Sequence, residues 1–223
     1  MDILQAMEQR HSVRQYTPEP LGEEAITTLR QEIERCNQAS GLHIQLVLDE
    51  PRAFDGFLAH YGKFSGVQNY IALVGAKSSN LDETCGYYGQ QLVLRAQQLG
   101  LNTCWVGLTY RKTPDACKVG NHEKLAAVIA LGHGVSNGSP HRSKSRDAVS
   151  NAGAGTPQWF QNGVDAALLA PTAMNQQKFL FRLDKNKVSV KAGFGFYTKI
   201  DMGIVKYHFE IGAGKEHFQW ELS

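Results

Sequence analysis

The sequence predicts an α+β fold built from two similar halves. Three observations support this prediction. Helical and strand patterns alternate along the chain, helix-then-strand pairs recur on both sides of a polar central segment, and residues 185–186 lie between two strand-like runs as in a hairpin. The chain has 223 residues, which is enough for one large domain or two small halves with a hydrophobic core.

The elements of the first half are expected from the spacing of apolar residues. Residues that recur three or four positions apart predict helices, whereas short alternating or continuous apolar runs predict strands. Helices are expected at residues 3–9, 23–37 and 83–99. Strands are expected at residues 43–48, 69–74, 103–106 and 125–131. Residues 52–64 fit neither pattern clearly.

The composition changes after residue 134. A polar and basic run is followed by a stretch of small residues, which is typical of a flexible linker. Beyond it, helices are expected at 157–169 and 199–211, and strands at 179–182, 188–191 and 218–221. We therefore divide the chain into a first half at 1–134, a linker at 135–155 and a shorter second half at 156–223.

The two halves show an internal correspondence. Asp49 matches Asp184 at the end of one helix–strand unit, and Gly89 matches Gly203 inside the next. The shared identities are few, but the order of the units indicates that one chain imitates a two-fold dimer. The sequence thus predicts an internal pseudo-two-fold duplication.

Composition limits the possible classes of function. Hydrophobic residues make up 42% and charged residues 20%, and the net charge is +2, which favours neither nucleic acid nor membrane surfaces as partners. A nucleic-acid binder using the basic run at 141–146 is a minor alternative. The four cysteines form no C-x-x-C pair and are interpreted as reduced core thiols. No apolar run reaches the roughly 18 residues of a membrane helix and no signal peptide is recognised, so we expect a cytoplasmic protein.

Residues 10–14, RHSVR, are a candidate phosphate site. Arg10 and Arg14 flank Ser12, and guanidinium groups bind phosphate oxygens bidentately. A solvated basic turn is the alternative interpretation of this segment.

Residues 170–177, APTAMNQQ, form a second candidate site between an expected helix and an expected strand. Pro171 should end the helix, and several amide and hydroxyl side chains follow it. Such groups could hold a flat heteroaromatic ring that offers donors and acceptors. An ordinary polar connection is the alternative.

Other motifs are incomplete. Residues 132–137, GHGVSN, lack the third glycine of a dinucleotide fingerprint, and no Ser or Thr follows Lys215 as a phosphate loop requires. The eight histidines show no metal-binding spacing, and G-x-S-x-G is absent, so we expect neither a metal site nor a protein nucleophile. His208 is interpreted as a packed or surface histidine rather than a ligand.

Four segments together resemble the nitroreductase family of flavin enzymes. Residues 10–14 resemble its R-x-S-x-R/K motif, 170–177 its P-S-S-x-N-x-Q segment, 86–107 its central helix, strand and flavin-facing glycine, and 144–146 its basic K-S-R element. The resemblance implies an α+β fold with mixed, mainly antiparallel sheets flanked by helices. It departs from the family at Val106, where many members have an acidic residue, and at Lys178–Phe179, where many have Pro-Trp.

In that family, each FMN lies between two subunits. Here the first half carries the phosphate motifs and the second half the ring-covering segment, which implies one complete FMN site at a pseudo-dimer interface. The protein would be a monomer acting as an internal pseudo-dimer, or a homodimer. The resemblance implies the following cofactor-binding residues: Arg10, His11, Ser12, Arg14, Lys63, Gly107, Lys144, Arg146, Pro171, Thr172, Ala173, Asn175 and Gln177.

The implied activity is an FMN-dependent NAD(P)H oxidoreductase with ping-pong kinetics. NADH or NADPH would reduce the flavin, and a small-molecule acceptor such as a nitroaromatic or a quinone would then be reduced in the same pocket. The flavin carries the chemistry, so no catalytic side chain is required. Two alternatives remain: a flavin-binding redox sensor or carrier whose pocket is closed by Lys178 or Phe179, and a reductive dehalogenase or flavin-fragmenting relative.

Overall fold

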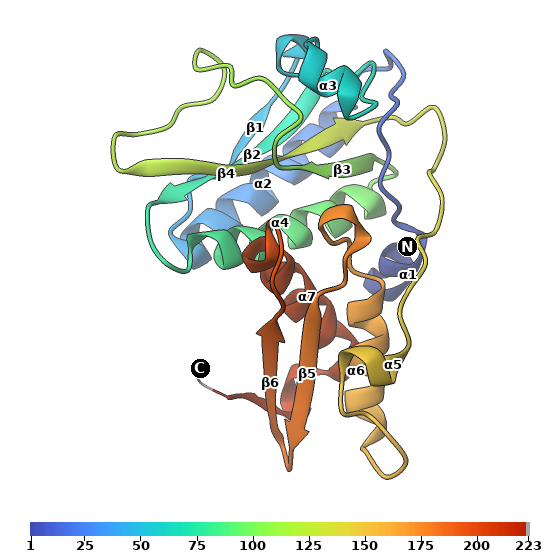
Figure 1. The fold of residues 1–223 in the computed structure, drawn as a ribbon. Helices are drawn as coiled ribbons and strands as arrows, with labels where there is room; N and C mark the ends of the chain where they lie inside the picture. Colours follow the sequence, from blue (N-terminus) through green and yellow to red (C-terminus); the bar gives the residue numbers. More distant parts are fainter. Residues whose placement is uncertain (222–223) are drawn as a thin grey trace.

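The structure is a computed structural model that describes residues 1–221, and it contains two sheets with helices packed around them (Figure 1). The first sheet has the strand order β1-β2-β4-β3, and all its neighbouring strands are antiparallel. Its strands are β1 (Gln45–Val47), β2 (Asn69–Ala76), β3 (Asn102–Val106) and β4 (Glu123–Gly132). The second sheet consists of β5 (Phe179–Asp184), β6 (Lys187–Ala192) and β7 (Gln219–Trp220).

In the second sheet, β5 and β6 form an antiparallel hairpin, and β7 pairs with β6 in parallel. The helices are α1 (Ile3–Gln9), α2 (Glu23–Ser40), α3 (Phe57–Tyr61), α4 (Leu81–Gln98), α5 (Arg146–Val149), α6 (Gln158–Leu168) and α7 (Thr198–Ala213). The ambiguous stretch resolves into a 3-10 turn at Pro51–Ala53 followed by α3. The predicted α+β fold with mixed, mainly antiparallel sheets flanked by helices is confirmed.

The first sheet is covered on both faces, which explains why its central strands are continuous apolar runs. Ile71 of β2 lies opposite Ile129 of β4, and both pack in the core that α2 and α4 complete. The next residue along β2, Ala72, faces the other side and packs with Phe54 and Phe64. Alternate residues of one strand therefore serve two different cores.

Aromatic side chains fill the core of the second half. Phe181 of β5 stacks on Phe209 of α7 with ring centroids 4.7 Å apart, and Phe160 of α6 contacts Phe209 edge-on at 5.7 Å. All three side chains are fully buried. Aromatic contacts of this kind add to the stabilisation from burial, so β5, α6 and α7 pack as one unit.

The two halves meet where α4 packs against α7. The helices cross here, where Glu83 forms an ion pair with Lys206 and Gln90 contacts His208. Gly86 and Gly203 lie at the closest approach. A Cβ atom on Gly86 would lie 2.0 Å from the carbonyl oxygen of Ile200, and one on Gly203 would lie 1.9 Å from that of Glu83. Only glycine fits either position.

These contacts are nearly symmetric about Gly86 and Gly203. The contacts thus pair Gly203 with Gly86 and not with Gly89, which instead accommodates the ring of Trp105. The element order α2-β1-β2-α4-β3 recurs as α6-β5-β6-α7-β7. The order supports the predicted duplication, which stays a prediction.

The segment expected to be a flexible linker is held against the second half in the structure. It descends beside α6 and contains α5 (Figure 1). His141 and Ser143 both hydrogen-bond to the carbonyl oxygen of Leu168, at 2.9 and 3.1 Å. Ser150 forms a parallel bridge with Phe181 of β5. These contacts fix the segment despite its linker-like composition.

Candidate functional site

Two adjoining cavities lie at the junction of the halves. One has a volume of about 210 Å³ and is walled mainly by the end of β3, the start of α7 and residues 171–174; we call it the apolar cavity. The other, the polar cavity, has a volume of about 460 Å³ and is walled by residues 10–14, 138–141 and 171–175. They share lining residues from both halves: Ser12, Arg14, Pro171, Thr172 and Met174. Together they form one groove.

The N-terminal segment contributes to the groove as an added strand. Beyond α1, Ser12 bridges to Thr103 in parallel, and the amide of Val13 donates to the carbonyl oxygen of Thr103 at 3.0 Å. The Val13 side chain is buried on the opposite side. In an extended backbone every second side chain shares a face, so the R-x-S-x-R spacing places Arg10, Ser12 and Arg14 along the groove.

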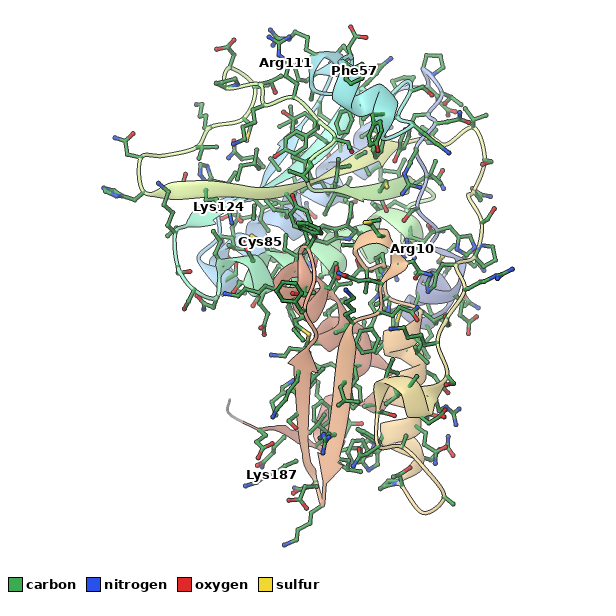
Figure 2. The ribbon with its side chains drawn as sticks, viewed as in Figure 1. Arg10, Phe57, Cys85, Arg111, Lys124 and Lys187 are labelled. Carbon is green, nitrogen blue, oxygen red and sulfur yellow. The ribbon has the colours of Figure 1, made fainter. Side chains whose placement is uncertain are left out.

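Arg10 is the most unusual charged residue in the groove. Its side chain is 3% exposed, and its Nε atom has no hydrogen-bond partner among the described residues. No carboxylate in residues 1–221 forms an ion pair with it, and burial lowers its pKa to about 10. Figure 2 shows Arg10 beside the turn that precedes β5. A buried cation without a counterion is costly, so this position suits a bound anion.

His11 lines the polar cavity beside Arg10. Burial lowers its pKa, and the nearby Arg10 charge acts in the same direction. Arg14 lines both cavities, and its guanidinium lies 6.0 Å from the ring centre of Phe64. The polar cavity thus has two guanidinium groups and imidazoles on its walls, which favours an anionic ligand.

Residues 171–177 form a tight turn that side chains hold in place. Met174 and Asn175 both have φ of 52°, in the left-handed region that few non-glycine residues adopt. The amide of Gln177 donates to Thr172 Oγ1 at 3.0 Å, and Asn175 Nδ2 donates to the carbonyl oxygen of Arg142 at 2.8 Å. Pro171, Thr172, Ala173 and Asn175 all line the groove.

Gly107 also lines the apolar cavity, at the end of β3. The ring of Tyr197 occupies the space beside Gly107 that a side chain would need. A Cβ atom on Gly107 would lie 2.4 Å from the ring Cζ. Tyr197 has φ of 56° and precedes the first residue of α7. Its ring narrows the cavity at the position where a flavin ring was expected.

Four expected site residues lie outside both cavities. Lys63 is in the turn after α3, and Arg146 forms an ion pair with Asp165 of α6. Lys144 Nζ donates to the carbonyl oxygen of Gln177 at 2.9 Å, and its amide donates to Gln177 Oε1 at 2.8 Å. Gln177 is buried by these contacts. In this arrangement Lys144, Arg146 and Gln177 stabilise the surroundings of the groove instead of lining it.

Lys178 and Phe179 do not close the groove either. The Lys178 ammonium donates to the carbonyl oxygen of Phe194 at 2.8 Å, and the Phe179 ring packs edge-on against Phe181 in the core. The residue that narrows the apolar cavity is Tyr197, and not Lys178 or Phe179. The FGFY run at 194–197 was the only available signal for an aromatic group there.

Asp201 was not singled out from the sequence, yet it lines the apolar cavity. It is 5% exposed and accepts hydrogen bonds from the amide of Ala173 at 2.9 Å and from Gln176 Nε2 at 2.7 Å. Burial raises its pKa to about 6. A carboxylate within the otherwise apolar stretch Ile200–Val205 of the expected helix was the available signal.

A buried polar chain fixes Trp105 in the wall of the apolar cavity. Trp105 Nε1 donates to Gln90 Oε1 at 3.0 Å, and Gln90 Nε2 contacts His208 Nε2 at 2.8 Å. His208 Nδ1 lies 2.9 Å from the carbonyl oxygen of Ala166. An imidazole that donates through Nδ1 and accepts through Nε2 satisfies this chain in its neutral form. Burial lowers the pKa of His208 to about 3, so the interpretation of His208 as a packed histidine is confirmed.

Among the side chains that the structure describes, no group of three His, Cys, Asp or Glu residues is placed to hold a metal ion. Across the same residues, no helix combines the length and apolar character that crossing a membrane requires. The four cysteines are free and buried.

The fold and the groove define a class of α+β protein in which two sheet-and-helix halves enclose one groove. The family described as "Putative TM nitroreductase" matches residues 2–213. Because this match spans almost the whole chain, the protein belongs to the nitroreductase family. No curated protein sequence matches the chain.

Solved structures show the same fold at low sequence identity. The crystal structure of a "putative nitroreductase" from Thermotoga maritima has a TM-score of 0.71 and 19% identity, and the match covers 97% of this chain and 85% of that one. A "putative nitroreductase in complex with FMN" from Desulfovibrio desulfuricans has a TM-score of 0.52 and 22% identity, over 67% of this chain and 95% of that one. A "putative NADH dehydrogenase/NAD(P)H nitroreductase" from Bacteroides thetaiotaomicron has a TM-score of 0.52 and 18% identity, over 66% of this chain and 95% of that one.

Proposed function

We propose that this protein is an FMN-dependent oxidoreductase that takes electrons from NADH or NADPH and passes them to a small-molecule acceptor. The observation that carries the proposal is the buried, unpartnered Arg10 at one end of a groove whose other end is apolar. FMN has a matching polarity, with a phosphate at one end and a flat ring at the other. The name of the Desulfovibrio structure, which includes FMN, is consistent with this proposal.

The described residues fit the two ends of FMN separately. Arg10, Arg14 and Ser12 would bind the phosphate in the polar cavity, where the guanidinium groups supply charge and the hydroxyl one hydrogen bond. Pro171, Thr172 and Ala173 would cover one side of the ring and exclude water from it. Bound FMN would supply hydride transfer, so the protein needs to hold and orient it rather than provide a nucleophile. A nitroaromatic or quinone acceptor would enter the same apolar cavity.

Both halves of one chain line this groove, which supports a complete site within a single chain. Arg10 and Ser12 come from the first half, whereas Thr172 and Asp201 come from the second. The protein would then function as a monomer. A homodimer would contain two such sites without sharing residues between them.

Tyr197 supports a second candidate function. Its ring fills the space beside Gly107 and narrows the apolar cavity to about 210 Å³. A cavity that accepts the flavin ring but leaves no room for a second substrate would make the protein a flavin-binding sensor or carrier instead of an enzyme.

Visible absorbance separates these functions. The purified protein is mixed with FMN, desalted, and then given NADH or NADPH without oxygen. A retained flavin that bleaches supports the oxidoreductase. A retained flavin that neither nucleotide bleaches supports the sensor or carrier, and loss of flavin on desalting argues against a tight FMN site.

A further inference from the structure

We propose that Asp201 is a positioning residue that, as a carboxylate, joins the turn 172–176 to the strap at residues 193–197, and so shapes the apolar cavity for its ligand. This inference rests on the proposed function, because the ligand is taken to be the flavin ring. Asp201 would act through Gln176 and the turn, without taking part in a chemical step.

The contacts form a short chain through Gln176. Asp201 Oδ1 accepts from the amide of Ala173, and Oδ2 accepts from Gln176 Nε2. The same Gln176 nitrogen donates to the carbonyl oxygen of Phe196 at 2.8 Å. Phe196 directly precedes Tyr197, which faces Gly107. One carboxylate therefore holds the turn directly and the strap through a single amide.

The ionised acid is the strongest acceptor for these two donors. A carboxylate has two accepting oxygens, and both face donors here. A protonated Asp201 can still accept both bonds, but as a neutral group it accepts them more weakly. An asparagine has one accepting oxygen, so its own amide donors would face either the amide of Ala173 or Gln176 Nε2. Rotating the Gln176 amide would relieve a conflict at Gln176, but its oxygen would then face the carbonyl oxygen of Phe196. Loss of the negative charge therefore weakens the link between the turn and the strap.

Burial dominates the electrostatics of this carboxylate, and its hydrogen bonds to Gln176 and Ala173 offset only part of the effect. Among the side chains that the structure describes, none forms an ion pair with Asp201, and the other titratable groups lining its cavity are Arg14, Cys104 and Tyr197. Burial raises the pKa of Asp201 from 3.8 to about 6. Between these values the folded protein binds a proton that the unfolded chain does not, so protonation favours folding and ionisation at neutral pH opposes it. A group that costs stability in its working form fits a binding role.

Asp201→Asn tests the proposal, because it keeps the shape and removes the charge at every pH. The matched control is Asp184→Asn, at an exposed position of the β5–β6 hairpin. Hydrogen exchange is measured at pH 7.5 without flavin, followed by FMN affinity at pH 7.5 and pH 5. Asp201→Asn should exchange faster at 172–176 and 193–197 and bind FMN about tenfold more weakly at pH 7.5, the loss of one hydrogen bond to a charged group.

The pH dependence distinguishes positioning from a structural defect. At pH 5 the wild-type Asp201 is mostly protonated and has lost its charge, so the affinity ratio between wild type and Asp201→Asn should fall well below tenfold. His11 and His141, which line the polar cavity, and the FMN phosphate are present in both proteins, so any effect of pH on them cancels in this ratio. Gln176→Leu removes the same link and should also weaken binding at pH 7.5.

Two results would overturn the proposal. One is unchanged exchange and affinity in both Asp201→Asn and Gln176→Leu, and the other is an affinity ratio that stays the same at the two pH values. If the wild type binds no flavin, the proposed function fails, whereas the exchange comparison in the flavin-free protein still decides whether Asp201 joins the turn to the strap.

Discussion

The ring of Tyr197 lies directly against Gly107: a Cβ atom on this glycine would be 2.4 Å from the ring Cζ and 2.8 Å from the hydroxyl oxygen. The two residues come from different halves, at the end of β3 and the start of α7. Position 107 must therefore be glycine for the Tyr197 ring to lie where it does, and this contact shapes the apolar cavity.

Gly107→Ala should push the Tyr197 ring out of place. Because the far end of a side chain can move, we expect a stability cost of about 1 kcal/mol, together with weaker flavin binding. Combining it with Tyr197→Ala removes the clash, so the two stability effects should not add. Thermal unfolding and FMN titration measure both quantities. Gly153→Ala is the control, since nothing lies within 4 Å of a Cβ atom there; additive effects would contradict the contact.

Arg10→Met should separate phosphate binding from ring binding. Removing a buried guanidinium that has no protein partner should weaken FMN binding about tenfold or more but leave riboflavin, which lacks the phosphate, bound equally well. Burial lowers the pKa of Arg10 to about 10, so its charge opposes folding at neutral pH, and the flavin-free variant should be at least as stable as wild type. Fluorescence titration with both flavins is the measurement, with exposed Arg30→Met as control. Equal losses for FMN and riboflavin would rule out a phosphate contact.

Gly203→Ala should separate the halves at the crossing of α4 and α7. The added methyl group would meet the carbonyl oxygen of Glu83 at 1.9 Å, and backbone cannot turn away as a side chain can. We expect a loss of about 3 kcal/mol in the free energy of unfolding, measured by urea denaturation. Gly153→Ala again serves as the control. A loss below about 1 kcal/mol would mean that the helices are not packed this closely.

His208 should make stability depend on pH. Its pKa is lowered to about 3 in the folded protein, whereas the unfolded chain protonates near 6.5. The stability that comes from keeping His208 buried and neutral is thus fully present above pH 6.5 and is lost as the pH falls from 6.5 towards 3. His208→Gln keeps an acceptor for Gln90 but cannot be protonated. When the pH is lowered from 7.5 to 5, the free energy of unfolding of the wild type should therefore fall by about 2 kcal/mol more than that of the variant. Denaturation at both pH values measures it; a constant difference would mean that the imidazole is already protonated or exposed.

Arg146→Gln should leave FMN affinity within about twofold of wild type, because its guanidinium is paired with Asp165 outside the groove. Arg14→Gln, on the wall of both cavities, should weaken FMN binding clearly. Comparing the two variants by FMN titration tests the placement of the 144–146 element. A larger effect at Arg146 would show that this element moves onto the phosphate when FMN binds.

The fold was predictable because its elements are locally encoded. The helix at 3–9 begins and ends as expected, and α4 and α7 lie within two residues of their expected bounds. Continuous apolar runs correctly predicted the buried strands β2 and β4. The packing of the segment at 135–155 on the second half could not be predicted, because its contacts, such as that of His141 with Leu168, join residues far apart in sequence.

The groove was predictable where spacing determines geometry. Arg10, Ser12 and Arg14 share a face because an extended backbone alternates its side chains. Lys144, Arg146 and Gln177 could not be placed from the sequence, since their hydrogen-bond partners depend on how the second half packs. Tyr197 and Asp201 were missed because they lie at the start of an ordinary helical pattern, and only the packing of α7 on α4 carries them to the groove.

We propose that one chain supplies both sides of one FMN site. Arg10→Met damages the first-half side, and Ala173→Glu places an acidic side chain on the second-half side of the apolar cavity. The two variants are unfolded and refolded together, and bound FMN is measured after desalting. We predict that the mixture retains no more FMN than the variants refolded separately. Recovery to about a quarter of the wild-type level would mean that sites form between two chains, and would contradict the claim.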